Sequence, residues 1–240
     1  MRVLIAVISY SGDADRGCHD AIRQTWGKDV APTGADLRFF IGHRRNDFVP
    51  ASDEVLVTEQ TYCTHDPEVC KDQIHIQFEV REILRWSVSQ GYDFTFLPST
   101  DTFLIPSKLM TSGFEKYDYS GFIIPPHIPV GTKSPEEIYG AHLYPWADAG
   151  VGWFMSKKAA EIVATSDLNW WTDDIGVAQT LGPYIERKEL TAGTIPDFWN
   201  SISWHYRWVT GKAYDPASGW MKSMYVYDHE HNVGGYDAGA

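Results

Sequence analysis

Three things are scarce in this chain: cysteine, positive charge and long apolar runs. Its 240 residues include only three cysteines, Cys18, Cys63 and Cys70, which is too few for a framework of disulfides. Cys63 and Cys70 are able to pair, but without a secretory signal we favour reduced thiols in a reducing compartment. We disfavour a zinc site formed by these two cysteines with His65 and His75, because the spacing matches no familiar ligand pattern.

The low content of basic residues limits the possible partners. The formal net charge is −12, and Lys and Arg form no stripe along the chain, which argues against a nucleic-acid partner and against an anionic membrane surface. No segment has the apolar length of a membrane span, and the first residues lack the layout of a signal peptide. We therefore expect a cytoplasmic protein without a membrane span. It would be either a bacterial protein or a viral protein in the cytoplasm of the host.

Aromatic residues, by contrast, are abundant. They make up 14% of a chain that is otherwise globular in composition, at 43% hydrophobic and 22% charged, and ten of them are Trp. Two interpretations remain open for these rings: they fill a core, or they line a site where sugars stack on their faces.

The order of apolar segments indicates an α/β fold. Residues 2–9 form a nearly continuous apolar run, which is typical of a central strand buried on both faces of a parallel sheet. Further strands are expected at residues 37–42, 54–58, 94–97 and 119–124, and helices at residues 18–26, 72–90, 157–165 and from 173 onward. This alternation predicts a single domain over residues 1–214, with a Rossmann-like, mostly parallel sheet between helices. Residues 215–240 are richer in Gly, Asp and His, and we expect a loosely ordered tail there.

A lone carboxylate follows one of the predicted strands. The strand at residues 94–97 ends in a small polar loop whose only charge is Asp101. Because ligands of open α/β sheets sit outside the carboxyl ends of the strands, Asp101 is a candidate site residue; the alternative is an Asp that only turns the loop. The loop at residues 11–17, between the first strand and helix, is a second place where nucleotides commonly dock.

Three later residues also allow two interpretations each. Asp173 and Asp174 fall in the first turn of a predicted helix, where carboxylates complement the helix dipole or serve in catalysis. His205 lies in an aromatic cluster, either as a core residue or as a ligand. Ser156 has the simpler expected role of capping the helix at residues 157–165.

Four motifs occur in an order shared with one family. Residues 21–27 are Ala-Ile-Arg-Gln-Thr-Trp-Gly, and residues 99–103 are Ser-Thr-Asp-Thr-Phe. Tyr-Pro at 144–145 precedes Gly-x-Gly-Trp-x-x-Ser at 150–156, and Asp-Asp-Ile follows at 173–175. Together these motifs resemble those of the superfamily of β-1,3-galactosyltransferases, N-acetylglucosaminyltransferases and Fringe glycosyltransferases.

The resemblance implies a GT-A fold and an inverting, metal-dependent hexosyltransferase. Such an enzyme moves a sugar from a nucleoside diphosphate sugar, typically a UDP-sugar, to a hydroxyl of a glycan or other acceptor. By the same resemblance, Asp101 and His205 are metal ligands for Mn²⁺ or Mg²⁺, which prefer oxygen ligands and bridge a diphosphate. Asp174, with Asp173 beside it, takes the position of the catalytic base that removes the acceptor proton.

The remaining site assignments concern the two substrates. Donor binding is assigned to Ser9, Tyr10, Arg16, Arg23, Ser99, Thr100 and Asp101, and acceptor binding to Trp153, Trp171 and Asp148. Ser99 and Thr100 stand where the family has Asp, so metal binding is expected to be weaker or water-mediated. A non-catalytic module of the same fold that binds nucleotide sugars or glycans is the alternative. A glycoside hydrolase with Asp101 and Asp174 as its carboxylate pair leaves the heptad at residues 21–27 unexplained.

Overall fold

The computed structural model describes residues 1–9, 17–42, 48–57, 74–125, 144–166, 173–205 and 215–231, with only the backbone described at 74–78, 173, 200, 205 and 226–231. The strands are β1 (Val3–Ser9), β2 (Asp36–Ile41), β3 (Glu54–Leu56), β4 (Phe94–Leu97), β5 (Thr102–Leu104), β6 (Tyr119–Gly121), β7 (Ile123–Ile124), β8 (Trp146–Ala147), β9 (Trp153–Ser156), β10 (Ala192–Thr194) and β11 (Ser203–His205). The α-helices are α2 (Cys18–Gln24), α3 (Ile74–Ser89), α4 (Pro106–Met110), α5 (Lys157–Thr165), α6 (Asp173–Glu186), α7 (Phe198–Ser201) and α9 (Trp220–His231). Short 3-10 turns are η1 (Trp26–Asp29), η2 (Ala31–Thr33), η3 (Phe114–Lys116) and η4 (Pro216–Ser218).

A seven-stranded sheet in the order β10-β6-β9-β4-β1-β2-β3 forms the centre of the described structure. β9 runs antiparallel to both of its neighbours, and the other adjacent pairs are parallel. The predicted α/β architecture, with a mostly parallel central sheet flanked by helices, is confirmed. Cys63, His65 and Cys70, which the cysteine pair and the zinc alternative involve, lie outside the described ranges, and for His75 only the backbone is described.

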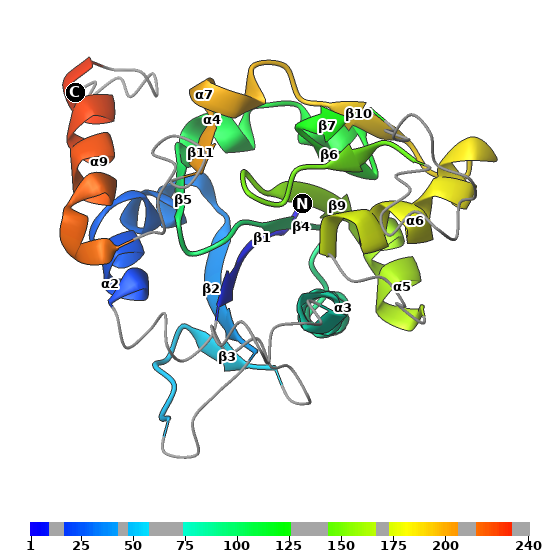
Figure 1. Cartoon of the computed structure of the whole chain (residues 1–240), viewed down its shortest axis with the longest axis horizontal. Helices are drawn as coiled ribbons and strands as arrows, with labels where there is room; N and C mark the ends of the chain where they lie inside the picture. The colour runs from blue at the N-terminus through cyan, green and yellow to red at the C-terminus, as the bar shows by residue number, and fades with distance from the viewer. Residues whose placement is uncertain are drawn as a thin grey trace, which may run out of the picture.

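Helices cover both faces of the sheet (Figure 1). Along β1, Val3, Ile5 and Val7 face one core, which also contains side chains of α2. Leu4 and Ala6 face a second core, shared with α3, α5 and α6. This alternation explains why β1 lacks polar residues before Ser9, since both of its faces are buried. Within the described ranges, none of the helices is long and apolar enough to cross a bilayer.

The predicted cap of α5 is confirmed at Ser156. Its hydroxyl oxygen accepts a hydrogen bond from the backbone N–H of Ala159 at 3.3 Å. The same hydroxyl donates to Asp118 Oδ1 at 2.7 Å, and Asp118 Oδ2 accepts from the backbone N–H of Thr191 at 2.9 Å. One side chain thus satisfies a helix terminus and links it to the start of β10.

The expectation of a loosely ordered tail is wrong for residues 215–231. They form η4 and α9, and α9 lies beside α2 (Figure 1). Met221 is buried in the core on that face, and Lys28 Nζ lies 4.3 Å from the ring centroid of Tyr225. Aromatic and apolar residues spaced along a polar segment were sufficient for helix packing, although they gave a weak periodic signal in the sequence.

Candidate functional site

The strand order reverses between β1 and β4, and this defines a candidate site. From β1 the chain proceeds to β2 on one side, while β4 pairs with β1 on the other. The pairing extends past the strand ends: Ile8 N donates to Pro98 O at 2.9 Å, and Ile8 and Ser99 form a parallel bridge. The carboxyl ends of β1 and β4, which lead into Ser9 and Ser99, therefore lie side by side. Such a switch point is where open α/β sheets bind ligands.

A tight turn after β4 holds Asp101. Thr102 N donates to Ser99 O at 3.2 Å, and Ser99 N donates to Thr102 Oγ1 at 3.2 Å. The Ser99 hydroxyl also donates to Asp101 Oδ1 at 2.5 Å. Asp101 does stabilise its own loop, as the simpler interpretation expected. A carboxylate has several acceptor positions on two oxygens, so this contact is compatible with a ligand-binding role as well.

Two other segments are anchored to this turn. The Thr102 hydroxyl donates to Gly150 O at 3.0 Å, and the Ser203 hydroxyl donates to Val151 O at 2.7 Å. The antiparallel pairing of β5 with β11 places the backbone of His205 opposite Thr102. The backbone of His205 thus lies next to the residue that follows Asp101, although the two are about a hundred positions apart in the chain.

The heptad at residues 21–27 has structural roles in this part of the molecule. The Thr25 hydroxyl donates to Ala21 O at 2.6 Å and closes the last turn of α2. Trp26 is fully buried, and its indole N–H donates to Thr102 O at 3.0 Å. Position 27 has room only for glycine, because a Cβ there would lie 2.7 Å from Ile22 O. The Trp26–Thr102 bond joins η1, which directly follows α2, to β5.

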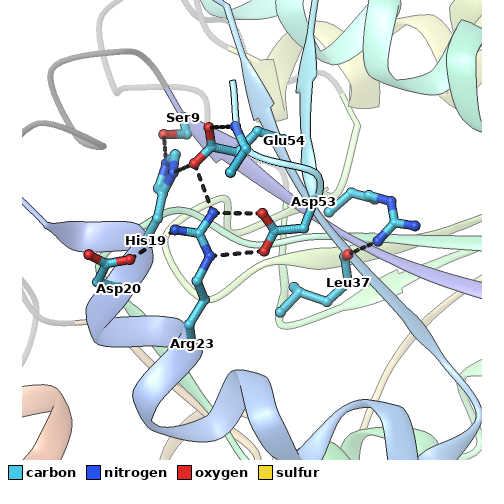
Figure 2. Close-up of polar contacts among 9 residues, drawn as sticks. Ser9, His19, Asp20, Arg23, Leu37, Asp53 and Glu54 are labelled. Atoms are coloured by element: carbon cyan, nitrogen blue, oxygen red, sulfur yellow. Dashed lines mark hydrogen bonds and ion pairs between the residues drawn. The ribbon is translucent and has the colours of Figure 1, made fainter. Parts of the chain in front are cut away.

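Arg23 is engaged by three carboxylates (Figure 2). Its Nε and Nη2 donate to Asp53 at 2.9 and 2.7 Å, Nη2 donates to Glu54 at 2.8 Å, and Nη1 donates to Asp20 at 2.9 Å. These bonds, chiefly to Asp53, raise the pKa of Arg23 against the opposing effect of burial. The guanidinium joins α2 to the start of β3, and the assignment of Arg23 to donor binding stays a prediction.

Ser9, at the end of β1, belongs to the same cluster (Figure 2). Ser9 Oγ lies 2.5 Å from His19 Nε2, and His19 Nδ1 lies 2.7 Å from Glu54 Oε1. The residues Ser9 and His19 are 4% and 1% exposed. Burial acts to raise the pKa of Glu54, but hydrogen bonds from the Ala51 backbone, His19 and Arg23 outweigh it, so the pKa of this carboxyl lies below its usual value.

Two residues assigned to acceptor binding are buried. Trp153 is 0% exposed and packs in the core shared with α5 and α6. Its indole Nε1 has no hydrogen-bond partner among the described residues. Asp148 is 3% exposed, and its Oδ1 accepts from Gly150 N at 2.8 Å. Both assignments are corrected: the Trp153 ring fills the core, and Asp148 shapes the turn before β9.

Asp174 lies in the first turn of α6, as predicted from the sequence. Its Oδ1 accepts from the backbone N–H of Ile175 at 2.7 Å, and the residue is partly exposed. α6 packs against α3, α5 and β8, on the face of the sheet opposite α2. Negative charge at this end also complements the helix dipole. The catalytic role of Asp174 therefore stays a prediction.

Several assigned residues lie outside the parts that the structure describes. Tyr10, Arg16 and Trp171 fall in omitted ranges, and for Asp173 and His205 only the backbone is described. Their assignments to donor, acceptor, catalytic and metal sites stay predictions. Among the described side chains, no group of three or more His, Cys, Asp or Glu residues is arranged to hold a metal ion.

Sequence reasoning missed His19, Asp53 and Glu54. Asp53 and Glu54 lie 30 or more positions from the residues of α2 that they contact, so no local pattern links them. The one available signal was the spacing of His19 and Arg23. At i and i+4 they share one face of a helix, and that face packs on Phe39.

No family model and no curated protein matches the chain. A structure described as a glycosyltransferase involved in the glycosylation of the major capsid of PBCV-1 is similar at 12% identity, over 92% of this chain and 99% of that one, with a TM-score of 0.47. The galactosyltransferase LgtC, in complex with donor and acceptor sugar analogues, is similar at 9% identity, over 79% of this chain and 65% of that one, with a TM-score of 0.35. Both likenesses are too distant to assign an activity to this chain.

Proposed function

We propose that this chain is an inverting glycosyltransferase of the GT-A type. It transfers a sugar from a nucleoside diphosphate sugar, a UDP-sugar in the first instance, to a hydroxyl group of a glycan or other acceptor. The observation that carries the proposal is the switch point, where Ser9 at the end of β1 adjoins the Ser99–Asp101 turn after β4. The four sequence motifs also support the proposal. Two of them, the heptad and the Ser99–Phe103 stretch, are in contact through the Trp26–Thr102 hydrogen bond.

Asp174 is the proposed general base. Its carboxylate takes the proton of the acceptor hydroxyl while that oxygen attacks the anomeric carbon of the donor. The bond from the anomeric carbon to the diphosphate oxygen breaks on the opposite side, and the electron pair leaves with the nucleoside diphosphate. Attack opposite to the leaving group gives inversion in a single step.

The described side chains fit a divalent cation only if substrate phosphates and water supply the other ligands. Asp101 offers one carboxylate at the switch point, and the backbone of His205 lies opposite Thr102. Mg²⁺ is commonly held by one or two carboxylates together with substrate phosphates and water, without a cage made wholly of protein. When bound, such a cation neutralises charge on the departing diphosphate. Asp101 would hold it, and the Ser99 hydroxyl orients that carboxylate.

The test is a thermal-shift screen of nucleotide sugars with and without Mn²⁺, followed by transfer assays with the best donor. A ligand that binds the native state raises stability by RT ln(1 + [L]/Kd), so the correct donor stands out from the others. We expect one donor to stabilise the wild type more strongly with Mn²⁺ present. We also expect Asp101→Asn to remove the Mn²⁺-dependent part of that shift.

Two outcomes separate this proposal from its alternative. Donor binding without turnover across a panel of hydroxyl acceptors favours the non-catalytic binding module, which the replacement of family carboxylates by Ser99 and Thr100 suggests. A lack of stabilisation by every nucleotide sugar contradicts both readings. The matched control is Asp197→Asn, a carboxyl replacement before α7, which leaves the donor shift unchanged.

A further inference from the structure

Thr102 forms hydrogen bonds with residues from separate segments at the switch point. Its backbone N–H donates to Ser99 O at 3.2 Å, and its carbonyl oxygen accepts from the indole N–H of Trp26 at 3.0 Å. Its hydroxyl donates to Gly150 O at 3.0 Å and accepts from Ser99 N at 3.2 Å. The residue is 0% exposed, so bulk water does not compete for these bonds. Thr102 therefore anchors the turn that precedes it.

The proton of the Thr102 hydroxyl has a defined direction. A carbonyl oxygen only accepts, so this proton lies in the bond to Gly150. The hydroxyl oxygen then accepts from the Ser99 N–H with a lone pair. Because threonine is β-branched, its χ1 has few alternatives, and both bonds depend on the same rotamer. One hydroxyl thus ties the first residue of the turn to the segment before β9.

Gly150 is held from its other side as well. Its N–H donates to Asp148 Oδ1 at 2.8 Å, and Asp148 is 3% exposed. β9 begins opposite the last residue of β4, so the segment that contains Gly150 lies at the carboxyl end of β4. The Thr102 hydroxyl is therefore bonded to a turn that is itself fixed at this edge of the sheet.

Asp101 lies between the two ends of the Ser99–Thr102 turn. Unlike Thr102 it is partly exposed, so the chain passes from a buried anchor to an accessible carboxylate within one residue. The Ser99 hydroxyl donates to Asp101 Oδ1 at 2.5 Å. Ser99 is in turn held by Thr102 through its N–H and its carbonyl oxygen. The orientation of the Asp101 carboxylate thus depends on Thr102 through Ser99.

This orientation matters more where one carboxylate has to hold a cation. Ser99 and Thr100 stand where the related family has Asp, which leaves Asp101 as the carboxylate of the motif. A ligand that is oriented beforehand loses less conformational entropy on binding. Replacing a group that orients a metal ligand commonly changes metal affinity by about ten- to a hundredfold.

We propose that Thr102 is a positioning residue, whose hydroxyl holds the Ser99–Thr102 turn against Gly150 and thereby orients the Asp101 carboxylate toward a divalent cation. The inference rests on the proposed function. It adds to that function a buried residue that acts through its neighbours.

Two substitutions at position 102 separate the hydroxyl from the packing. Thr102→Val keeps the shape of the side chain and removes the hydroxyl, whereas Thr102→Ser keeps the hydroxyl and removes a methyl group. The probe is whichever of UDP, GDP, ADP and CDP stabilises the wild type most with Mn²⁺ present. The readout is the Mn²⁺ concentration that gives half-maximal binding of this nucleotide in equilibrium dialysis. We expect Thr102→Val to raise it about tenfold and Thr102→Ser to stay within about twofold of the wild type.

Thr95→Val is the matched control. Thr95 is 2% exposed on β4, and its hydroxyl oxygen lies 2.5 Å from that of Ser87 on α3. The same substitution there removes a buried hydroxyl away from the Asp101 turn. We expect it to lower stability in thermal unfolding and to leave the Mn²⁺ dependence unchanged. Should Thr102→Val fail to fold, Thr102→Ser and Thr102→Ala give the same comparison, because serine and alanine differ by the hydroxyl alone.

The results that overturn the inference are distinguishable from failure of the proposed function. Equal Mn²⁺ dependence in the wild type and Thr102→Val, equal losses in Thr102→Val and Thr102→Ser, or a similar loss in Thr95→Val removes the positioning role and leaves the proposed function standing. Nucleotide binding by the wild type that does not depend on Mn²⁺ removes the cation and the role of Thr102 with it. Failure of the wild type to bind any of the four diphosphates removes the proposed function as well.

Discussion

The indole N–H of Trp26 donates a hydrogen bond to the carbonyl oxygen of Thr102, 3.0 Å away, across 76 positions of sequence. Thr102 directly follows Asp101, and Trp26 is the penultimate residue of the heptad at residues 21–27. The two motifs of the family resemblance are therefore in physical contact. The heptad supports the turn that carries the proposed metal ligand.

Replacing Trp26 by Phe tests this support. The change removes the N–H donor and leaves space beside a buried carbonyl, so we expect the free energy of unfolding to fall by about 1–3 kcal/mol. We also expect weaker Mn²⁺ binding in the presence of the donor nucleotide, because the Asp101 turn loses a fixed neighbour. The measurements are urea unfolding and titration of free Mn²⁺ by electron paramagnetic resonance.

Trp86→Phe is the matched control for Trp26. Trp86 lies on α3 and packs against Phe40 and Tyr92, on the opposite face of the sheet. This variant is expected to lose stability with no change in Mn²⁺ affinity. If both variants bind Mn²⁺ as the wild type does, Trp26 serves the core alone.

Gly152→Ala is expected to be strongly destabilising. Gly152 has a φ of +86°, and an added Cβ would lie 2.6 Å from Phe96 Cζ and 3.1 Å from Leu97 O. Both the left-handed backbone and the overlap with β4 oppose the substitution, at about 2–4 kcal/mol together. Gly34→Ala isolates the backbone part, because Gly34 has a φ of +80° and nothing within 4 Å of the added Cβ. The free energy of unfolding of Gly34→Ala, measured in urea, should fall by only about 1 kcal/mol. Equal losses in the two variants would show that the neighbours of Gly152 move to relieve the overlap.

Much of the fold could be predicted from the sequence because its signals are local. The apolar run before Ser9 identified a strand buried on both faces, and Ser156 identified the start of α5. α9 could not be identified in this way. Its helix is weakly amphipathic, and it is stabilised by distant partners such as Phe103 and Lys28.

The site was less predictable, because its contacts join distant segments. Asp101 could be identified as a candidate from its place after a strand, and the structure places its turn at the expected edge of the sheet. The partners of Arg23 in the structure, Asp53 and Glu54, could not be predicted, because no sequence pattern links them to it. Trp153 was assigned to acceptor binding, yet its burial is decided by packing with distant residues of α5 and α6.

Asp174→Asn separates catalysis from binding. The amide keeps the size of the side chain and cannot accept a proton, so we expect kcat for transfer to fall by at least about a hundredfold. Donor affinity, measured by calorimetry, should stay close to that of the wild type. Glu115→Gln in η3, a carboxyl replacement away from α6, provides the control and should transfer normally. Full activity of Asp174→Asn would remove Asp174 from the mechanism.

Stability at acid pH should depend on Asp118, which joins α5 to β10. Burial acts to raise its pKa, but hydrogen bonds from the Thr191 backbone, Ser156 and the Thr191 hydroxyl outweigh it, so the pKa of this carboxyl in the folded protein is lowered. The unfolded value is about 3.9. Because the folded pKa is the lower of the two, the stabilisation is fully present well above pH 4 and is lost as the pH falls through the folded pKa. Urea unfolding of the wild type and of Asp118→Asn at pH 6, 4 and 3 should therefore show a stability difference that narrows with acid, by no more than about 1 kcal/mol because solvent screens a partly exposed group. A difference that stays constant over this range would mean that Asp118 acts through its hydrogen bonds regardless of charge.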